Sequence, residues 1–444
     1  MKKSIYIKQK INFFKKKKVF VSGDKSLSIR FILLSSLSRG KSVAYNILKS
    51  EDVLSAIECI KKLGVKINFK NEKCIVFGKG LNGYKFKKNL TLNAGNSGTT
   101  ARLLIATLIN SNQKIKIVGD KSLQKRDMYR VINPLKKFGA KFKSKNGKLP
   151  IEVEGLKYTR PIFYNENIGS AQCKSAVMIA GLKTSGKTKL RCLPSRNHTE
   201  LMFKNVLKIP IKIHKKNKYD LIELDGLREF NSFNYKIPGD ISSAAFFIIL
   251  TLLSKKKSLT IKNVNINPSR TGIIKILNMM GASIRFLNKK IYKGEINADI
   301  FVKSKENLKA INLDPKINSS AIDEFLLIFL AASQCSGIST FSNLSELNKK
   351  ESRRLDWGIK ILNMIGIKTK KIKNDGIKIW GNPNLNLNKE YIIKNYLKDH
   401  RIFMVSTIAA LVFGGKWKIY DPISFRTSFP SFLKILKTLG AKIS

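Results

Sequence analysis

One pattern recurs through the chain: apolar residues at helical spacing, then a glycine, then a short apolar strand. It reads K-K-L-G-V-K-I at residues 61–67 and returns around Gly139, Gly281, Gly366 and Gly440. Each glycine lies where the end of a helix favours a left-handed residue. Successive glycines are 75, 142, 85 and 74 residues apart, and the double gap holds a degenerate copy, V-L-K-I-P-I-K-I, at residues 206–213.

The repeat predicts six units of about 70–85 residues, three before roughly residue 238 and three after it. A period of this length is too long for a solenoid and fits a small mixed α/β unit. Three such units can pack their helices inward, which gives two similar domains. We expect residues 23–238 to form one domain and residues 1–22 with 239–444 the other, with a small-molecule site in the cleft between them.

The chain is strongly basic, with 85 Lys+Arg against 29 Asp+Glu in 444 residues and a formal charge of +56. Such a charge is typical of proteins that bind nucleic acid or anionic membranes. However, Lys, Asn, Ile and Phe are all abundant together, as AT-rich coding produces, and the lysines are spread along the whole length. We therefore favour compositional drift, with attraction of anionic substrates as a by-product.

The five cysteines lie far apart and only three histidines are present, so no zinc site is expected. Free thiols suit a reducing cytoplasm. The N-terminus lacks the apolar region of a secretory signal, and the longest apolar runs, residues 244–253 and 325–332, are too short to span a bilayer. We expect a cytoplasmic protein without a membrane partner, in which these two runs form buried helices.

Residues 92–103 read L-N-A-G-N-S-G-T-T-A-R-L. Gly95 and Gly98 allow close approach of a ligand to the backbone, and free N–H groups at a helix start attract anions. Arg102 adds a forked cation. We expect an anion cradle here, followed by a helix from Leu103, although an ordinary strand, glycine turn and helix would explain the same residues.

The octet G-D-K-S-L-x-x-R stands at residues 23–30 and again at residues 119–126, on either side of this cradle. Each copy supplies a lysine, a hydroxyl and an arginine beside a glycine turn. We expect Lys25 and Arg30 just before a helix over residues 31–37, and Arg126 at the start of a segment that runs into residues 131–138. A single octet is more typical of a solvated helix cap, but two copies beside a cradle favour an anion site.

Two further polar segments precede helices. Residues 169–174, G-S-A-Q-C-K, open an apolar helix expected over residues 176–182, and residues 195–200, S-R-N-H-T-E, enter another. Small polar residues at a helix start suit an anion or sugar-like hydroxyls, or simply cap the helix. His198 is a possible base, although a single histidine in a loop is more often structural.

Acidic residues are scarce, which makes their placement informative. Asp323 precedes the buried run 325–332, where a partly desolvated carboxylate suits a general base or, alternatively, a helix cap. Glu351 lies among cations in residues 349–354, a segment that could also be a solvated charge run. Arg401, in D-H-R, precedes a helix expected over residues 402–412.

Together these segments place many cations beside few acids. The cations are Lys25, Arg30, Arg102, Arg126, Arg196, Lys350, Arg354 and Arg401. Only Asp323 and Glu351 stand among them as plausible proton carriers. Such a site would bind two highly anionic small molecules and move protons between them by electrostatic positioning and acid–base catalysis. No nucleophilic cysteine, Ser–His pair or metal cluster is recognisable, so neither a metal nor a cofactor is expected.

The motifs resemble those of the EPSP synthase family, the 3-phosphoshikimate 1-carboxyvinyltransferases. The matching segments run in family order from about residue 20 to 430: G-D-K-S-L-S-I-R, G-N-S-G-T-T-A-R-L, G-D-K-S-L-Q-K-R, G-S-A-Q-C-K-S-A, P-G-D-I-S-S-A-A-F-F, N-P-S-R-T-G, K-E-S-R-R-L, D-H-R and T-S-F-P. The resemblance implies the α/β enolpyruvyl transferase fold, a two-domain inside-out α/β barrel of six βαβαββ-type units, three in each domain. It also implies a monomer without a nucleic-acid partner.

The implied reaction transfers the enolpyruvyl group of phosphoenolpyruvate to the 5-hydroxyl of shikimate-3-phosphate and releases phosphate, by addition and elimination, on the pathway to chorismate and aromatic amino acids. The residues implied for shikimate-3-phosphate are Lys25, Ser26, Arg30, Ser170, Ala171, Gln172, Arg196, Asp323 and Lys350. Those implied for phosphoenolpyruvate are Lys25, Asn96, Gly98, Arg126, Gln172, Arg354 and Arg401. Asp323 would deprotonate the hydroxyl, Glu351 would protonate the methylene carbon, and Lys25 would complete the catalytic set.

Four positions depart from the family pattern. Ile29 replaces a common histidine, Asn348 a common arginine, and Arg353 the aspartate of K-E-S-D-R. Thr427 stands where some members have lysine, and neighbouring Arg426 is a possible substitute. None of these changes removes an implied acid, base or main cation, so we expect an active enzyme.

Two other functions make different demands on the sequence. The sister enzyme that transfers enolpyruvyl to UDP-N-acetylglucosamine typically has a reactive cysteine in the loop that matches residues 119–126, and this chain has none there. A nucleic-acid-binding protein would interleave basic residues with exposed aromatic residues on one face. No such pattern is recognisable in this sequence.

Overall fold

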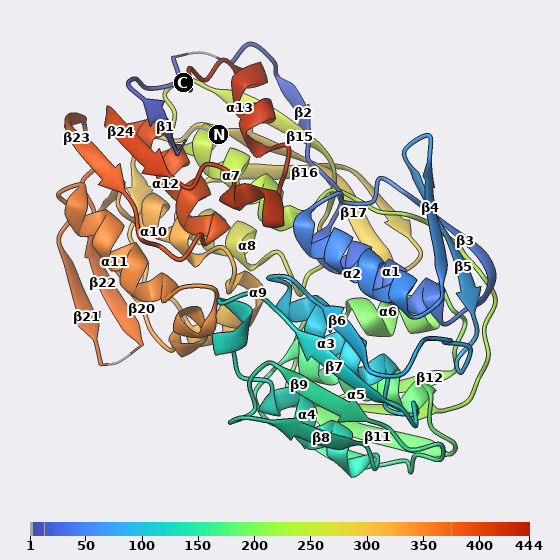
Figure 1. Ribbon diagram of the computed structural model, residues 1–444. Helices are drawn as coiled ribbons and strands as arrows, with labels where there is room; N and C mark the ends of the chain where they lie inside the picture. The colour runs from blue at the N-terminus through green and yellow to red at the C-terminus, as the bar shows by residue number, and fades with distance from the viewer. Residues whose placement is uncertain (1–2, 13, 374) are drawn as a thin grey trace. The chain divides into compact units, whose positions relative to one another are not determined.

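The computed structural model describes residues 3–12, 14–373 and 375–444 (Figure 1). The chain divides into two compact units. Unit 1 consists of Met1–Ser22, Pro238–Ile291 and Ile296–Ser444, and unit 2 consists of Gly23–Ile237 with the short segment Tyr292–Glu295.

Unit 2 contains three four-stranded sheets of one design. In each, two parallel strands are followed by an antiparallel hairpin. The first sheet has the order β14 (Asn234–Lys236), β3 (Arg39–Tyr45), β5 (Lys73–Lys79), β4 (Lys66–Lys70). The second has β6 (Leu90–Asn93), β7 (Lys114–Val118), β9 (Ile151–Glu154), β8 (Lys141–Ser144). The third has β10 (Phe163–Glu166), β11 (Lys187–Cys192), β13 (Asp220–Asp225), β12 (Ile211–Lys215).

Each repeat of unit 2 contributes one inner and one outer helix. The inner helices are α1 (Lys25–Ser36), α3 (Gly98–Thr107) and α5 (Ala171–Leu182), which are buried on nearly all sides. The outer helices are α2 (Glu51–Lys62), α4 (Tyr129–Lys137) and α6 (His198–Asn205). The inner helices are apolar around most of their circumference because they are surrounded by protein, which is the inside-out arrangement expected from the sequence.

Unit 1 repeats the design, with its N-terminal strands completing two of the sheets. Its sheets have the orders β16-β17-β15-β2, β20-β22-β21 with the pair β18-β19, and β1-β24-β23. The strands are β1 (Ser4–Ile7), β2 (Lys18–Phe20), β15 (Ser258–Asn265), β16 (Ser283–Tyr292), β17 (Glu295–Lys303), β18 (Leu308–Lys309), β19 (Cys335–Ser336), β20 (Ile338–Phe341), β21 (Thr369–Ile372), β22 (Gly376–Trp380), β23 (Leu387–Ile393) and β24 (Gly414–Tyr420). β2 pairs in parallel with β15, and β1 pairs antiparallel with β24.

The inner helices of unit 1 are α7 (Ile241–Leu252), α10 (Phe325–Ala332) and α12 (His400–Phe413), and every residue in them is buried. The remaining helices are α8 (Gly272–Met279), the short α9 (Asn318–Ala321), α11 (Arg354–Met364) and α13 (Phe432–Leu439). The two longest apolar runs are therefore core helices, as predicted. Among the described residues, no helix is long and apolar enough to cross a membrane.

The repeated glycines have the backbone conformation that the sequence pattern predicted. Gly64, Gly139, Gly281, Gly366 and Gly440 have φ angles of 84°, 109°, 86°, 81° and 105°. In the degenerate copy Lys208 takes the left-handed conformation, with φ 57°, between α6 and β12. The third unit along the chain thus keeps the turn although it has lost the glycine that makes the turn easy.

Most inner helices begin earlier than the sequence predicted, whereas α10 begins at Phe325, as expected. α1 begins at Lys25 rather than Phe31, α3 at Gly98 rather than Leu103, α5 at Ala171 rather than Ala176, and α12 at His400 rather than Ile402. The reason is N-capping: the side chains of Asp24, Ser97, Ser170 and Asp399 accept backbone N–H groups of the first turns. The polar residues of the motifs therefore lie inside the first turns of the helices, not in loops ahead of them.

Candidate active site

In unit 2, the first turn of α1 holds the residues of the first octet. The Lys25 ammonium contacts Asp52 Oδ2 at 2.9 Å. The Arg30 guanidinium is nearly buried and donates to Thr199 Oγ1 and Ser175 Oγ, each at 2.9 Å, and to the Ser26 carbonyl at 3.2 Å. Arg30 therefore ties α1 to α5 and α6.

The glycine cradle brings together residues from three segments of unit 2. An added Cβ on Gly98 would lie 2.9 Å from Arg126 Nη1 and 3.2 Å from Arg102 Nη1. Arg102 donates to Gln172 Oε1 at 2.6 Å, and Gln172 Nε2 donates to Thr99 Oγ1 at 2.9 Å. The second octet and the α5 segment thus converge on the cradle, as expected of a single anion site.

Asn96 lies on the exposed side of the same turn, where its amide donates to Asp120 Oδ2 at 2.6 Å. Asp120 belongs to the second octet, and its other oxygen accepts the Leu123 backbone N–H at 2.8 Å. This contact joins the cradle to the octet that carries Arg126.

The loop ahead of α5 is organised by a carboxylate that the sequence analysis missed. Glu166 is buried and accepts the backbone N–H groups of Ile168, Gly169 and Ser170, each at 3.0 Å. The Ser170 hydroxyl in turn caps the helix by accepting from Cys173 N at 3.3 Å. Glu166 therefore fixes the backbone that presents Ser170, Ala171 and Gln172.

A buried ion pair supports the segment that carries Arg196. Lys174 on α5 contacts Glu200 on α6 at 2.6 Å and donates to the Ser195 carbonyl at 3.3 Å. His198, in the same segment, is fully buried and lies 2.6 Å from Glu295. The structural interpretation of His198 therefore holds, because the imidazole is enclosed by protein.

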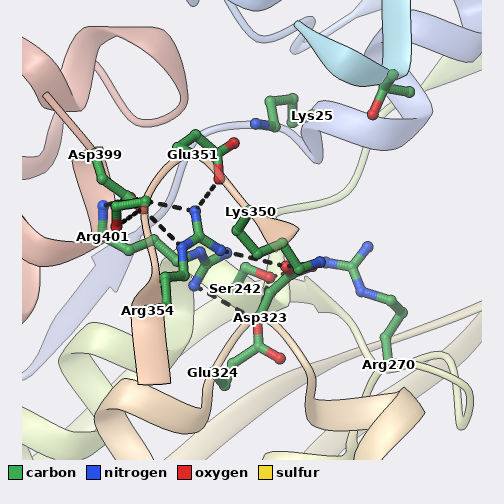
Figure 2. A network of polar contacts seen from close by, with 12 residues as sticks. Lys25, Ser242, Arg270, Asp323, Glu324, Lys350, Glu351, Arg354, Asp399 and Arg401 are labelled. Atoms are coloured by element: carbon green, nitrogen blue, oxygen red, sulfur yellow. Dashed lines mark hydrogen bonds and ion pairs between the residues drawn. The ribbon is translucent and has the colours of Figure 1, made fainter. Parts of the chain in front are cut away.

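In unit 1, Arg354 lies at the centre of a cluster of carboxylates (Figure 2). Its Nε donates to Asp399 Oδ2 at 2.9 Å, its Nη2 lies 2.5 Å from Glu351 Oε2, and its Nη1 lies 3.6 Å from Asp323 Oδ1. Burial by itself lowers the pKa of Arg354, but the surrounding carboxylates outweigh it, so the pKa is raised above its usual value. Asp399 contributes most to that rise.

Asp399 is held from several sides. It caps α12 by accepting from Arg401 N at 2.9 Å, and it accepts from Ser352 Oγ at 2.8 Å. Burial by itself would raise the pKa of this fully buried carboxyl, but the Arg354 guanidinium reverses that effect, so the pKa lies below its usual value. Asp399 is thus a fixed anion that orients Arg354.

Asp323 does not cap α10. The residue at the cap position is Glu324, and its side chain makes no capping hydrogen bond. Asp323 Oδ1 instead lies 3.1 Å from the Lys350 ammonium. The alternative of a helix-capping Asp323 is therefore wrong, and its partly exposed carboxylate is directed at a cation instead.

Glu324, fully buried, extends the network to Arg401. Its Oε1 accepts from Ser242 Oγ and lies 3.7 Å from Arg401 Nη1. Ser242 Oγ also accepts from Arg270 Nη2 at 2.9 Å. Figure 2 shows these side chains beside the Arg354 cluster.

The departures from the family pattern lie outside these contacts. Arg353 Nε forms an ion pair with Asp356 Oδ2 at 2.5 Å near the surface. Its positive charge is therefore paired with a carboxylate outside the Arg354 cluster. Asn348 Oδ1 accepts from Leu355 N at 3.0 Å and so supports the start of α11. Ile29 is fully buried, as expected of a packing change, and Thr427 donates to the Ser424 carbonyl at 2.9 Å.

Each unit thus assembles its own cluster from the candidate residues. Unit 2 holds Lys25, Ser26, Arg30, Asn96, Gly98, Arg126, Ser170, Ala171, Gln172 and Arg196. Unit 1 holds Asp323, Lys350, Glu351, Arg354 and Arg401. The sequence analysis missed the supporting carboxylates Asp52, Glu166, Glu324 and Asp399. Asp399 and Glu324 carried a usable signal, an acidic residue immediately ahead of an apolar helix.

The comparison with known structures defines the class first. The enolpyruvyl transferase NikO from Streptomyces tendae matches with a TM-score of 0.77 over 99% of this chain and 98% of its own, at 13% sequence identity. The chain therefore has the mixed α/β enolpyruvyl transferase fold, as predicted.

The family follows from closer matches. The model of the family EPSP synthase (3-phosphoshikimate 1-carboxyvinyltransferase) matches residues 14–436. The 3-phosphoshikimate 1-carboxyvinyltransferase of Ruthia magnifica subsp. Calyptogena magnifica is 41% identical over 427 residues, which is 96% of this chain and 95% of the relative. The EPSP synthase structure from Acinetobacter baumannii has a TM-score of 0.85 at 32% identity and covers 99% of both chains. The chain belongs to the EPSP synthase family, which confirms the resemblance.

Proposed function

We propose that this protein transfers the enolpyruvyl group of phosphoenolpyruvate to the 5-hydroxyl of shikimate-3-phosphate and releases phosphate. Membership of the family supports EPSP synthase activity in the shikimate pathway. The observation that carries the proposal is a chain of three ion pairs, in which Asp323 contacts Lys350 and Arg354, and Arg354 contacts Glu351. This cluster supplies both the acid–base groups and the cations that such a transfer needs.

Shikimate-3-phosphate is proposed to bind mainly through unit 2. The proposed ligands are Lys25, Ser26, Arg30, Ser170, Ala171, Gln172 and Arg196, with Lys350 and Asp323 from unit 1. The capped first turn of α5 suits a phosphate because backbone N–H groups and a hydroxyl meet there. The buried hydrogen bonds of Arg30 support a fixed guanidinium in this group.

Phosphoenolpyruvate is proposed to bind to Lys25, Asn96, Gly98, Arg126, Gln172, Arg354 and Arg401. Gly98 suits this role because its missing side chain leaves the Arg126 guanidinium close to the backbone. Arg354 and Arg401 suit the carboxylate, because an arginine can bind a carboxylate through two parallel hydrogen bonds.

In the proposed reaction Asp323 accepts the proton of the 5-hydroxyl, and the hydroxyl oxygen attacks C2 of phosphoenolpyruvate while Glu351 gives a proton to C3. The result is a tetrahedral intermediate that has a methyl group. Loss of a methyl proton to Glu351 and departure of phosphate from C2 then restore the double bond. Lys25, with its flexible ammonium, is proposed to balance charge as the phosphate leaves.

The two clusters are proposed to serve one active site between residues 23–238 and residues 1–22 with 239–444. Anionic substrates would favour a closed state, because the two cationic domains repel each other without them. A monomeric state and a cytoplasmic location complete the proposal.

The decisive experiment is a phosphate-release assay with purified protein. Release is expected only when shikimate-3-phosphate and phosphoenolpyruvate are both present, with the enolpyruvyl ether detected by ³¹P and ¹H NMR. UDP-N-acetylglucosamine in place of shikimate-3-phosphate should give no release. The proposal would be overturned if the folded protein released no phosphate with both substrates. It would also be overturned if phosphate were released from phosphoenolpyruvate only when the UDP-sugar replaced shikimate-3-phosphate.

A further inference from the structure

The contacts of Arg354 in unit 1 raise a question about substrate binding. Three carboxylates lie within 4 Å of its guanidinium, while Lys350 is the second cation of the group. When all five side chains are ionised, this group has a formal charge of −1. A carboxylate substrate that approaches Arg354 would therefore meet a group that is already over-neutralised.

The three carboxylates differ in how firmly they are held. Asp399 is fully buried and takes hydrogen bonds from Arg354, from Ser352 and from a backbone N–H of α12. Asp323 lies 3.6 Å from Arg354 and is closer to Lys350, at 3.1 Å. Glu351 is 13% exposed and precedes α11. Glu351 is thus the carboxylate that combines the shortest contact with Arg354 and partial exposure to solvent.

We propose that in the ligand-free enzyme Glu351 occupies the position on Arg354 that the carboxylate of phosphoenolpyruvate takes. Binding of the substrate then displaces Glu351, which takes up a proton. This inference rests on the proposed function for the roles of Glu351 and Arg354. It adds a link between them: one carboxylate replaces another on Nη2, and the released carboxylate takes one proton from solvent.

The physical basis is the loss of a cation and the gain of an anion. Glu351 leaves a guanidinium 2.5 Å away and finds itself beside the charged substrate. Both changes favour the protonated carboxyl over the carboxylate. The proton that the reaction must deliver to C3 therefore arrives together with the molecule that receives it.

The test compares three variants in a background that blocks turnover. Phosphoenolpyruvate is titrated calorimetrically into Asp323→Asn saturated with shikimate-3-phosphate, near pH 7, in two buffers of different ionisation enthalpy. The same titration is made with Asp323→Asn Glu351→Gln. The control is Asp323→Asn Glu346→Gln, which removes an equal charge at an exposed residue paired with Lys349 at 2.9 Å.

The expected result is an uptake of protons that is smaller by about half a proton or more when Glu351 is Gln, and unchanged in the control. The affinity of the Glu351→Gln variant at pH 8 should be about ten-fold tighter than that of the background, because no anion competes for Arg354. Equal proton uptake in all three variants would overturn the inference. Weaker binding by the Glu351→Gln variant would also overturn it, because Glu351 would then assist the substrate.

Failure of the proposed function has a different signature. If Asp323→Asn still releases phosphate at the wild-type rate, the base assignment is wrong, and the inference about Glu351 is then tested by kinetics. The KM for phosphoenolpyruvate should rise with pH in the wild type and stay flat in Glu351→Gln. Parallel pH profiles of the two proteins would contradict the inference whatever the identity of the base.

Discussion

The arginines of the two clusters are held by different kinds of partner. In unit 1, Arg354 is surrounded by carboxylates, and Arg401 lies 3.7 Å from the buried Glu324. In unit 2, Arg30 and Arg102 donate chiefly to hydroxyls, an amide and carbonyls. Neutral acceptors orient a cation without cancelling its charge, so unit 2 is suited to hold phosphates and unit 1 to hold and move protons.

Two buried cations make the same contrast. The carboxylates around Arg354 raise its pKa despite burial. Lys183 in unit 2, whose ammonium donates to the Leu81 carbonyl and lies over the Tyr84 ring, has its pKa lowered by burial to about 7. The balance between burial and nearby carboxylates therefore sets the direction of the pKa shift of each of these two cations.

The largest effect is expected from the base in unit 1. Asp323→Asn should lower kcat by about 10²–10⁴-fold, because a neutral amide cannot accept the proton of the substrate hydroxyl. The KM values should change far less, since the amide still fits beside Lys350. Phosphate release at saturating substrates measures the effect, and Asp314→Asn, whose side chain caps a short 3-10 helix, is the control. A loss of less than ten-fold would assign the proton transfer to another group.

The next largest effect concerns stability. Asp399→Asn should lower the free energy of unfolding by about 3–5 kcal/mol at pH 7, because it leaves the buried Arg354 without its main partner. Chemical denaturation measures the loss. Asp356→Asn, which weakens the solvent-accessible contacts of Asp356 with Arg353, Lys371 and Asn348, should cost less than about 1 kcal/mol. Equal losses of unfolding free energy in the two variants would show that the buried network stabilises the protein no more than an exposed ion pair does.

The same variant carries a pH dependence. The pKa of Asp399 in the folded protein lies below its unfolded value of about 3.9, so its contribution is present above that pH and is lost as the pH falls further. Asp399→Asn should therefore reduce the steepness of acid destabilisation below about pH 4. Wild-type steepness in the variant would mean that other carboxyls cause the acid transition.

A smaller effect is expected from the carboxylate that shapes unit 2. Glu166→Gln should raise the KM for shikimate-3-phosphate by about ten-fold, because an amide cannot accept all three N–H groups of the loop as a carboxylate does. The kcat should stay within about three-fold, since Glu166 is placed behind the loop and not among the acid–base groups. Glu58→Gln, at an exposed residue paired with Lys61, is the matched control. A fall in kcat with unchanged KM would contradict the positioning role.

The fold was predictable because each repeat contains backbone conformations and buried surfaces that favour particular residue types. The left-handed turn after a helix selects glycine, as at Gly64 and Gly440, and the fully buried helices are apolar on every side. The apolar pattern predicts helix starts that are too late, because it marks only where the apolar residues of a helix begin. The caps Asp24 and Ser97 extend the helices backward over polar residues, which single-sequence periodicity cannot show.

The cations of the candidate site were predictable from motif strings, but their partners were not. Glu166 acts on the residues that follow it, and Asp52 meets Lys25 from a different helix. Such contacts depend on how the helices pack, and an isolated acidic residue in a basic chain gives no sign of them. The structure therefore adds the charge balance around each cation, which the motif strings lack.

The smallest effect is expected at Gly98, where a substitution by alanine tests the contrast between the units by adding a methyl group without changing any charge. In Gly98→Ala the new Cβ would lie 2.9 Å from Arg126 Nη1, which is too close, and 3.2 Å from Arg102 Nη1. Both atoms are ends of flexible side chains, so the guanidinium groups can shift by a few tenths of an ångström and the protein should fold normally. We expect the KM for phosphoenolpyruvate to rise about three- to ten-fold with kcat little changed, because a displaced cation weakens ground-state and transition-state binding alike.

The inhibitor glyphosate, which the family resemblance places at the same spot, should lose more affinity than the substrate does. Steady-state inhibition constants for Gly98→Ala and the wild type give this comparison directly. Equal losses for the two anions would mean that the cradle lies elsewhere in the site. A large loss of kcat would mean that Arg126 takes part in the chemistry, and the division between an anion-holding unit 2 and a proton-moving unit 1 would then be too sharp.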